Sequence, residues 1–414
     1  MSFKKIVFTL PFFCVALLFG DPKRQALYQS LDPTSISQHL AFCELYGDTD
    51  EGRLALQHAW KLLSSHSELA NNNLPPLSFP HNINSFISLI NPSTHTSENL
   101  EISAETLSCI EQISKHLPNR KYKGYSAKTI EEVLALPSEE IDLSRAILLS
   151  QLPQTPEACH KMRSYLATLD LMALQILARL PKEASADEKV RALNSLIFYE
   201  MGFRFPLHSA YSNQIDHFTF LPAVLESRKG VCLGVSTLVL CLAQRLDLPL
   251  EIITPPGHIY IRAQVNGTER NIETTLRGVH IHSDEYLGIN TKKLHIRTLK
   301  EVIGMAHFNQ ASVWLAQSEW QKAADAYKEA LRFTPEDRLT KMLYGCSLLL
   351  SDRDQEAKVL LKQAQTIPQP FSISPDILVD DILLGNVDKE SLRPLFLYVD
   401  ETRKSIVKKK EALA

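Results

Sequence analysis

The chain has 414 residues, which at about 100–200 residues per domain corresponds to two or three domains. Its hydrophobic share of 44% and charged share of 22% are those of a folded protein and exclude wholesale disorder. Lys and Arg number 44 against 47 Asp and Glu, and this balance argues against a nucleic-acid-binding protein with a basic surface. Glycine is scarce, with 14 residues, which favours helices joined by short loops.

Residues 1–20 have the layout of a secretory signal peptide. Lys4 and Lys5 form a short basic region, and an uncharged apolar run of 14 residues extends from Ile6 to Phe19. Such a run is too short to span a relaxed bilayer. We therefore expect an exported protein, either periplasmic or secreted. The alternative is an uncleaved segment that anchors the protein, and only then would a membrane be a partner.

Residues 21–135 are expected to form a helical region. Apolar residues recur there at three- and four-residue spacing in 37–46, 50–63, 103–116 and 127–136. The region carries no recognisable chemical motif, so the sequence assigns it no role.

Within residues 136–300 the spacing of apolar residues changes from that of helices to that of strands. The spacing predicts helices at 142–149, 160–180 and 188–201, and then short strands at 250–253, 258–262 and 270–273. Asn266-Gly267 predicts a tight hairpin turn between the last two strands. Helices followed by a small antiparallel sheet predict an α+β domain within a predominantly helical chain.

Residues 305–370 repeat at a spacing of 34 residues. Small residues at the repeated positions let antiparallel helices approach closely, and Trp314 and Trp320 fill the space between hairpins. The repeated positions are Ala311 with Gly345, Ala323 with Ala357, and Ala330 with Ala364. The pattern resembles the tetratricopeptide repeat (TPR), in two copies. Such a pair either binds a protein partner or packs on the neighbouring domain, and both stay open. Residues 371–414 are expected to form a helical tail.

Cys232 is the candidate nucleophile. It opens a predicted helix that runs to about Leu246, so it faces the unpaired N–H groups and the positive end of the helix dipole, which favour a thiolate. His258 follows 26 residues later at the start of a strand, and Glu273 lies in the strand paired with it. In this arrangement the histidine takes the thiol proton and the carboxylate orients the imidazole.

The alternative is that Cys232 is an ordinary packing residue, because unpaired cysteines are among the most buried side chains. Cys241 provides an internal comparison. It lies nine positions along the same helix, about 180° round at 100° per residue, so it faces away from Cys232 and is expected in the core.

The chain reads Gly-Val-Cys at 230–232, Arg-Leu-Asp-Leu-Pro at 245–249, Pro-Gly-His at 256–258 and Ile-Glu-Thr at 272–274. These motifs resemble those of the transglutaminase-like superfamily, and most of all those of its bacterial SirB-type branch, over residues 139–290. The resemblance implies a papain-like α+β core, with a Cys-bearing helix packed on a small antiparallel sheet. It also implies Cys232 as nucleophile and His258 as base, while Glu273 stands where the family usually has Asp. Many members of that branch lack the cysteine and are thought to be non-catalytic.

These observations lead to two functional hypotheses. The first is an exported thiol enzyme that hydrolyses or transfers an acyl group at an amide, isopeptide or ester bond of a protein or peptide. The second is a non-catalytic scaffold whose repeats bind a protein. Neither a metal nor an organic cofactor is implied, because His280, His282 and nearby Asp284 lack the second ligand cluster that a zinc site requires.

Overall fold

The computed structural model describes residues 21–65, 90, 102–206, 217–255, 257–287, 294–367 and 377–396. Contacts divide the chain into two compact units, Met1–Thr106 and Leu107–Ala414. The predicted signal segment and most of the predicted tail lie outside the described residues. Among the helices that are described, none is both long and apolar enough to cross a membrane.

The first unit contains α1 (Pro22–Gln29), α2 (Ile36–Tyr46) and α3 (Asp50–Leu63). Ser35 and Thr49 cap α2 and α3, each accepting a hydrogen bond from a backbone N–H of the first turn. Leu40 and Ala55 are fully buried between these helices. The helices predicted at 37–46 and 50–63 are confirmed.

The second unit begins with a helical layer, and residues 107–135 pack within it. Its helices are α5 (Ala104–Ile113), α6 (Ile130–Ala135), α7 (Leu143–Gln151), α8 (Pro156–Leu177), α9 (Ala186–Asn194), α11 (Leu221–Ser227) and α12 (Cys232–Arg245). Short helical turns lie at Pro118–Lys121 (η2), Lys123–Ser126 (η3) and Ser138–Glu140 (η4), and a π-helical turn at Ser195–Glu200 (η5) continues α9.

The sheet has four antiparallel strands in the order β3-β2-β1-β4. The strands are β1 (Leu250–Thr254), β2 (Tyr260–Val265), β3 (Thr268–Ile272) and β4 (His295–Arg297), with η7 (Thr274–Leu276) and η8 (Ser283–Tyr286) between the last two. Asn266 and Gly267 both adopt positive φ, as the predicted hairpin turn requires. The α+β, predominantly helical class is confirmed. The sequence analysis did not predict β4, because three residues are too few for a period of two to be recognised.

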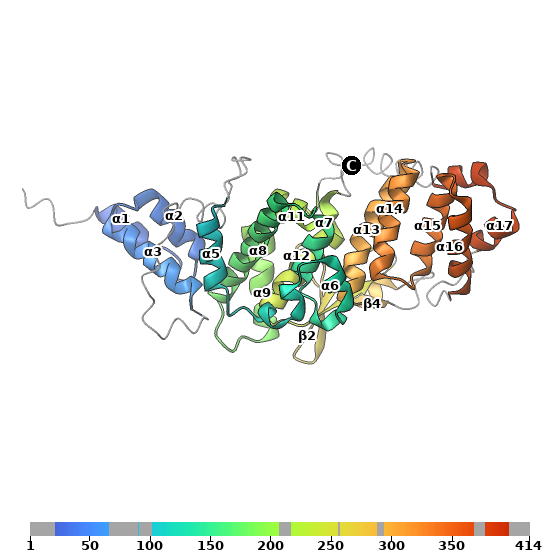
Figure 1. Cartoon of the computed structure of the whole chain (residues 1–414). Helices are drawn as coiled ribbons and strands as arrows, with labels where there is room; N and C mark the ends of the chain where they lie inside the picture. Colours follow the sequence, from blue (N-terminus) through green and yellow to red (C-terminus); the bar gives the residue numbers. More distant parts are fainter. Residues whose placement is uncertain are drawn as a thin grey trace, which may run out of the picture. The chain divides into compact units, whose positions relative to one another are not determined.

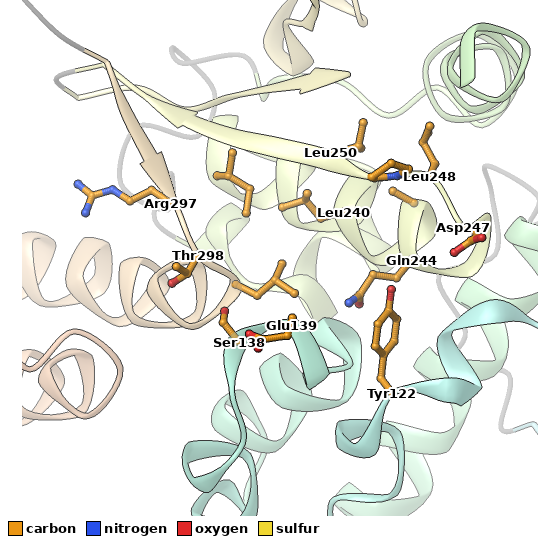
Figure 2. Close-up of a pocket in the computed structure, with 14 residues that line it drawn as sticks. Tyr122, Ser138, Glu139, Leu240, Gln244, Asp247, Leu248, Leu250, Arg297 and Thr298 are labelled. Carbon is orange, nitrogen blue, oxygen red and sulfur yellow. The ribbon is translucent and has the colours of Figure 1, made fainter. Parts of the chain in front are cut away.

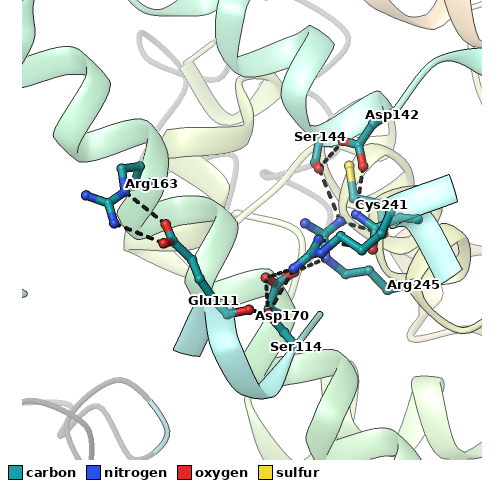
Figure 3. A network of polar contacts seen from close by, with 10 residues as sticks. Glu111, Ser114, Asp142, Ser144, Arg163, Asp170, Cys241 and Arg245 are labelled. Carbon is teal, nitrogen blue, oxygen red and sulfur yellow. Dashed lines mark hydrogen bonds and ion pairs between the residues drawn. The ribbon is translucent and has the colours of Figure 1, made fainter. Parts of the chain in front are cut away.

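A buried polar network holds the C-terminal end of α12 (Figure 3). The side chain of Arg245 is completely buried, and its Nε lies 2.8 Å from Oδ1 of Asp170 on α8. Arg245 also donates to the hydroxyl of Ser144 on α7 and to the carbonyl of Cys241. Asp170 accepts further hydrogen bonds from Ser114 and Arg120. Because a buried charge needs such partners, the network fixes α12 against three neighbouring segments.

The second unit ends in antiparallel helices that lie side by side in Figure 1. They are α13 (Leu299–Ala316), α14 (Trp320–Phe333), α15 (Arg338–Leu350) and α16 (Asp354–Thr366), followed by α17 (Leu378–Leu384). Ser318 and Asp352, 34 positions apart, both adopt a φ of 63° between paired helices. The backbone therefore repeats at the spacing found in the sequence.

Candidate active site

Cys232 occupies the first position of α12 because the preceding turn is fastened on both sides. The N–H of Gly230 donates to the carbonyl of Arg204 at 3.1 Å, and the N–H of Val231 donates to that of Phe218 at 3.2 Å. Gly234 permits this close approach, since a Cβ there would lie 2.2 Å from the Phe218 carbonyl oxygen. The first turn of α12 therefore has a fixed direction, and Cys232 stands half-buried at its start.

The β2–β3 hairpin brings His258 and Glu273 to the same end. Ile261 pairs with Ile272, and continuing this register by one pair puts Tyr260 opposite Glu273. His258 lies two residues before the start of β2, and Glu273 directly follows the end of β3, so both lie at the same end of the hairpin. Their side chains meet there, with His258 Nε2 2.7 Å from Glu273 Oε2.

Four donors surround the carboxylate of Glu273, whose side chain is only 3% exposed. The N–H and the hydroxyl of Thr275 donate to Oε1 at 3.1 and 2.6 Å. Oε2 accepts from His258 and from the hydroxyl of Tyr286, the latter at 2.6 Å. Both oxygens are thus held in place.

The protonation of this pair follows from its contacts. Burial lowers the pKa of His258, but its hydrogen bonds with Cys232 and Glu273 outweigh burial and raise that pKa to about 9. Burial raises the pKa of Glu273, but the hydrogen bonds from His258, Thr275 and Tyr286 outweigh it and lower that pKa to about 2. At neutral pH the site therefore holds an imidazolium against an ionised carboxylate.

The structure thus brings all three predicted residues together. Glu273 contacts Nε2 of His258, and a side-chain hydrogen bond with Cys232 contributes to the raised pKa of the same imidazole. Cys241 is fully buried, as expected, and burial raises the pKa of its thiol. The catalytic roles of the three residues stay predictions.

The sequence analysis missed Tyr286 and Thr275. Tyr286 lies in η8, 13 residues after Glu273, and no motif marks it. No sequence signal marks Thr275 either, because the local side-chain turns that a sequence indicates are closed by Ser, Thr, Asn or Asp, and the acceptor here is Glu273.

The histidines considered as metal ligands, His280 and His282, make contacts of another kind. His280 and His282 lie in the loop before η8, with ring centroids 4.7 Å apart. His280 Nδ1 accepts the N–H of Asn271 at 3.0 Å. Within the described parts of the chain, no group of three or more His, Cys, Asp or Glu side chains is placed to hold a metal ion.

A cavity of about 590 Å³ lies elsewhere on the same helix (Figure 2). The C-terminal half of α12 forms one wall through Leu240 and Gln244, and the rest is formed by β1, β4, the start of α13, Tyr122 and the short turn η4. None of Cys232, His258 and Glu273 lines this cavity. It is therefore separate from the candidate active site.

Comparison with known proteins agrees with this geometry. A profile of the transglutaminase-like superfamily matches residues 163–296, a range that contains Cys232, His258 and Glu273. This segment is a transglutaminase-like domain. No curated protein and no solved structure matches the chain.

The transglutaminase-like domain begins within α8 and ends in β4. It includes α12, the strands β1, β2 and β3 and most of β4, and it stops before the hairpins α13–α16. The match names the superfamily without a branch. The SirB-type branch, the TPR assignment and the domain limits at 135, 300 and 370 therefore stay predictions.

Proposed function

We propose that the transglutaminase-like domain is a thiol enzyme that hydrolyses or transfers an acyl group at an amide, isopeptide or ester bond. The observation that carries the proposal is the chain of contacts from Cys232 through His258 to Glu273. A nucleophile bonded to a base, with the base oriented by a third group, is the arrangement that thiol catalysis requires.

The proposed reaction has two steps. In the first, Cys232 Sγ attacks the carbonyl carbon, the bond to the leaving amine or alcohol breaks, and His258 gives its proton to the leaving group. In the second, water or an amine attacks the thioester, His258 takes a proton from it, and the carbon–sulfur bond breaks. The backbone N–H of Cys232, at the start of α12, would help to bind the oxyanion.

Export, the branch and the substrate are parts of the same proposal. The signal-like segment at 1–20 supports a periplasmic or secreted location, with an anchored form as the alternative. In such a compartment water is the most abundant acceptor, which favours hydrolysis over transfer. The sequence motifs of residues 139–290 support membership of the SirB-type branch. The expected substrate is a protein or a peptide.

A second candidate function is a scaffold in which the TPR-like pair binds a protein. The 34-residue period of the backbone between Ser318 and Asp352 supports it. The small residues of the repeat, among them Ala323 and Ala357, are fully buried, as such a pair requires. Because a scaffold does not use the thiol, this candidate function predicts that Cys232→Ala binds its protein partner as well as the wild type does.

Alkylation of the full chain with iodoacetamide at neutral pH tests the enzyme proposal. Mass spectrometry of peptides gives the rate constant for each cysteine, with exposed Cys159 as an ordinary thiol and buried Cys241 as an unreactive one. We expect Cys232 to react at least tenfold faster than Cys159, and p-nitrophenyl acetate to leave an acetyl group on Cys232. A Cys232 no faster than Cys159 would contradict the enzyme proposal and leave the scaffold.

A further inference from the structure

We infer that Tyr286 is a positioning residue of the candidate active site, which holds the carboxylate of Glu273 against His258. The inference rests on the proposed function and adds a fourth member to the arrangement. It follows from the contacts of Tyr286, from the length of the Glu273 side chain, and from the way η8 is fastened to the sheet.

Tyr286 contacts both members of the pair. Its hydroxyl donates to Glu273 Oε2, the same oxygen that accepts from His258 Nε2. Its ring stacks on the imidazole, with centroids 5.8 Å apart and planes inclined by 21°. One side chain thus limits the movement of the carboxylate and of the histidine ring together.

Glu273 needs more restraint than a shorter acid would. Its side chain has one more rotatable bond than Asp, the residue usual in the family that the sequence resembles. An ionised carboxylate accepts about four hydrogen bonds, and here Thr275 supplies two, His258 one and Tyr286 one. Thr275 fixes only Oε1, so Tyr286 is the donor that restrains the oxygen facing His258.

The turn that carries Tyr286 is itself fixed. Ser283, at the start of η8, makes hydrogen bonds of 3.0 Å with the hydroxyl of Tyr260 on β2 and with the side-chain amide of Asn271 on β3. Asn271 also donates to the carbonyl of Ile281 at 2.6 Å. The Tyr260 and Tyr286 rings stack with centroids 4.7 Å apart. The sheet therefore holds Tyr286 in place before a substrate arrives.

The pH dependence of thiol reactivity reports this role. The titratable groups around Glu273 are His258 ahead of β2, Tyr260 on β2, Tyr286 on η8, and Cys232 on α12 through His258. Loss of the Tyr286 hydroxyl removes one donor to Oε2, so the pKa of Glu273 rises and its carboxylate is free to turn away from His258. Glu273 then becomes protonated, and stops orienting His258 toward the thiol, at a higher pH than in the wild type.

The test measures the second-order rate constant of Cys232 with iodoacetamide from pH 3 to pH 9 in the full chain. In Tyr286→Phe we expect the acid limb to move to higher pH, so that the rate constant at a fixed pH below the midpoint falls about five- to tenfold. Tyr165→Phe is the matched control, because it also removes a tyrosine hydroxyl bonded to a glutamate, Glu226, outside the site. Its profile should equal that of the wild type.

A double-mutant cycle separates positioning from general loss of structure. If Tyr286 acts through Glu273, Tyr286→Phe should change the rate constant less than twofold in a Glu273→Gln background. Ser283→Ala, which loosens η8 without touching Glu273, should shift the acid limb in the same direction by less.

The outcomes that oppose the inference are distinct. A reactive Cys232 with the same profile in wild type and Tyr286→Phe overturns the role of Tyr286 and leaves the proposed function standing. An equal loss in both backgrounds also overturns it, since Tyr286 would then act independently of Glu273. A wild-type Cys232 no faster than Cys159 overturns the proposed function, and this inference with it.

Discussion

The hydroxyl of Thr274 donates a hydrogen bond of 3.4 Å to the carbonyl oxygen of Cys232. Thr274 follows Glu273 directly, and its hydroxyl also lies 3.2 Å from that of Ser236 on α12. The residue after the carboxylate thus touches the first and second turns of the helix that carries the thiol. Direct contact, rather than a long connecting segment, sets the distance between Cys232 and the His258–Glu273 pair.

The first prediction concerns the protonation of His258. Its pKa of about 9 depends in part on Cys232, so Cys232→Ala should lower it while the bond with Glu273 remains. NMR titration of the chain labelled in its histidine rings measures this change. Cys241→Ala is the control, because that buried thiol lies on the far side of α12 and should leave the His258 pKa where it is. An unchanged His258 pKa in Cys232→Ala would show that the thiol and imidazole do not interact.

The second prediction concerns the length of the acid. Asp at position 273 falls one methylene short and cannot reach His258 Nε2 while it keeps both bonds from Thr275. We expect Glu273→Asp to lower the iodoacetamide rate constant of Cys232 about tenfold at pH 5, and Glu273→Gln to lower it at least as much. A fully reactive Glu273→Asp would mean that the hairpin adjusts to the shorter side chain.

The third prediction is a pH dependence of stability. The pKa of Glu273 is about 2 in the folded chain against an ordinary 4.5, so this group stabilises the fold above about pH 4.5 and loses that contribution as pH falls toward 2. The difference in unfolding free energy between wild type and Glu273→Gln should therefore shrink in acid, from a ceiling of about 3 kcal/mol. Urea unfolding at several pH values measures it. A difference that grows as pH falls would reverse the sign and contradict the assignment.

The fourth prediction concerns the buried network in Figure 3. Asp170→Ala leaves the completely buried Arg245 without its carboxylate, and we expect a loss of about 3–5 kcal/mol in unfolding free energy. The exposed pair of Arg163 with Glu111 in the same figure is the control, since Arg163→Ala should cost below about 1 kcal/mol. Urea unfolding followed by circular dichroism compares the two. Equal losses of unfolding free energy in the two variants would mean that the buried network stabilises the fold no more than the Arg163–Glu111 pair does.

Local signals in the sequence were sufficient for most of the candidate site. A cysteine at a helix start, a histidine at a strand start and a turn at Asn266-Gly267 each depend on a few neighbouring residues. The hairpin then fixed which carboxylate would face His258. These features were predictable because short-range spacing determines them.

Other features depend on contacts between distant segments. The Arg245–Asp170 pair joins residues 75 positions apart, and nothing near either residue marks the other. Tyr286 reaches Glu273 only because Asn271 and Ser283 fasten η8 to the sheet. The strand β4 joins the sheet through pairing with β1, and its three residues are too few for an alternation to be recognised in the sequence. Such features require the tertiary structure.

Only one reactive group comes from outside the hairpin. His258, Glu273, Thr275 and Tyr286 belong to one stretch of 29 residues, 258–286, whereas the thiol comes from α12. A single substitution at Cys232 would abolish the proposed chemistry and leave every hydrogen bond of the Glu273 carboxylate in place. In evolutionary terms, an enzyme of this design is one codon from a folded, inert descendant, and the acid–base pair would persist in that descendant as a trace of the ancestral reaction.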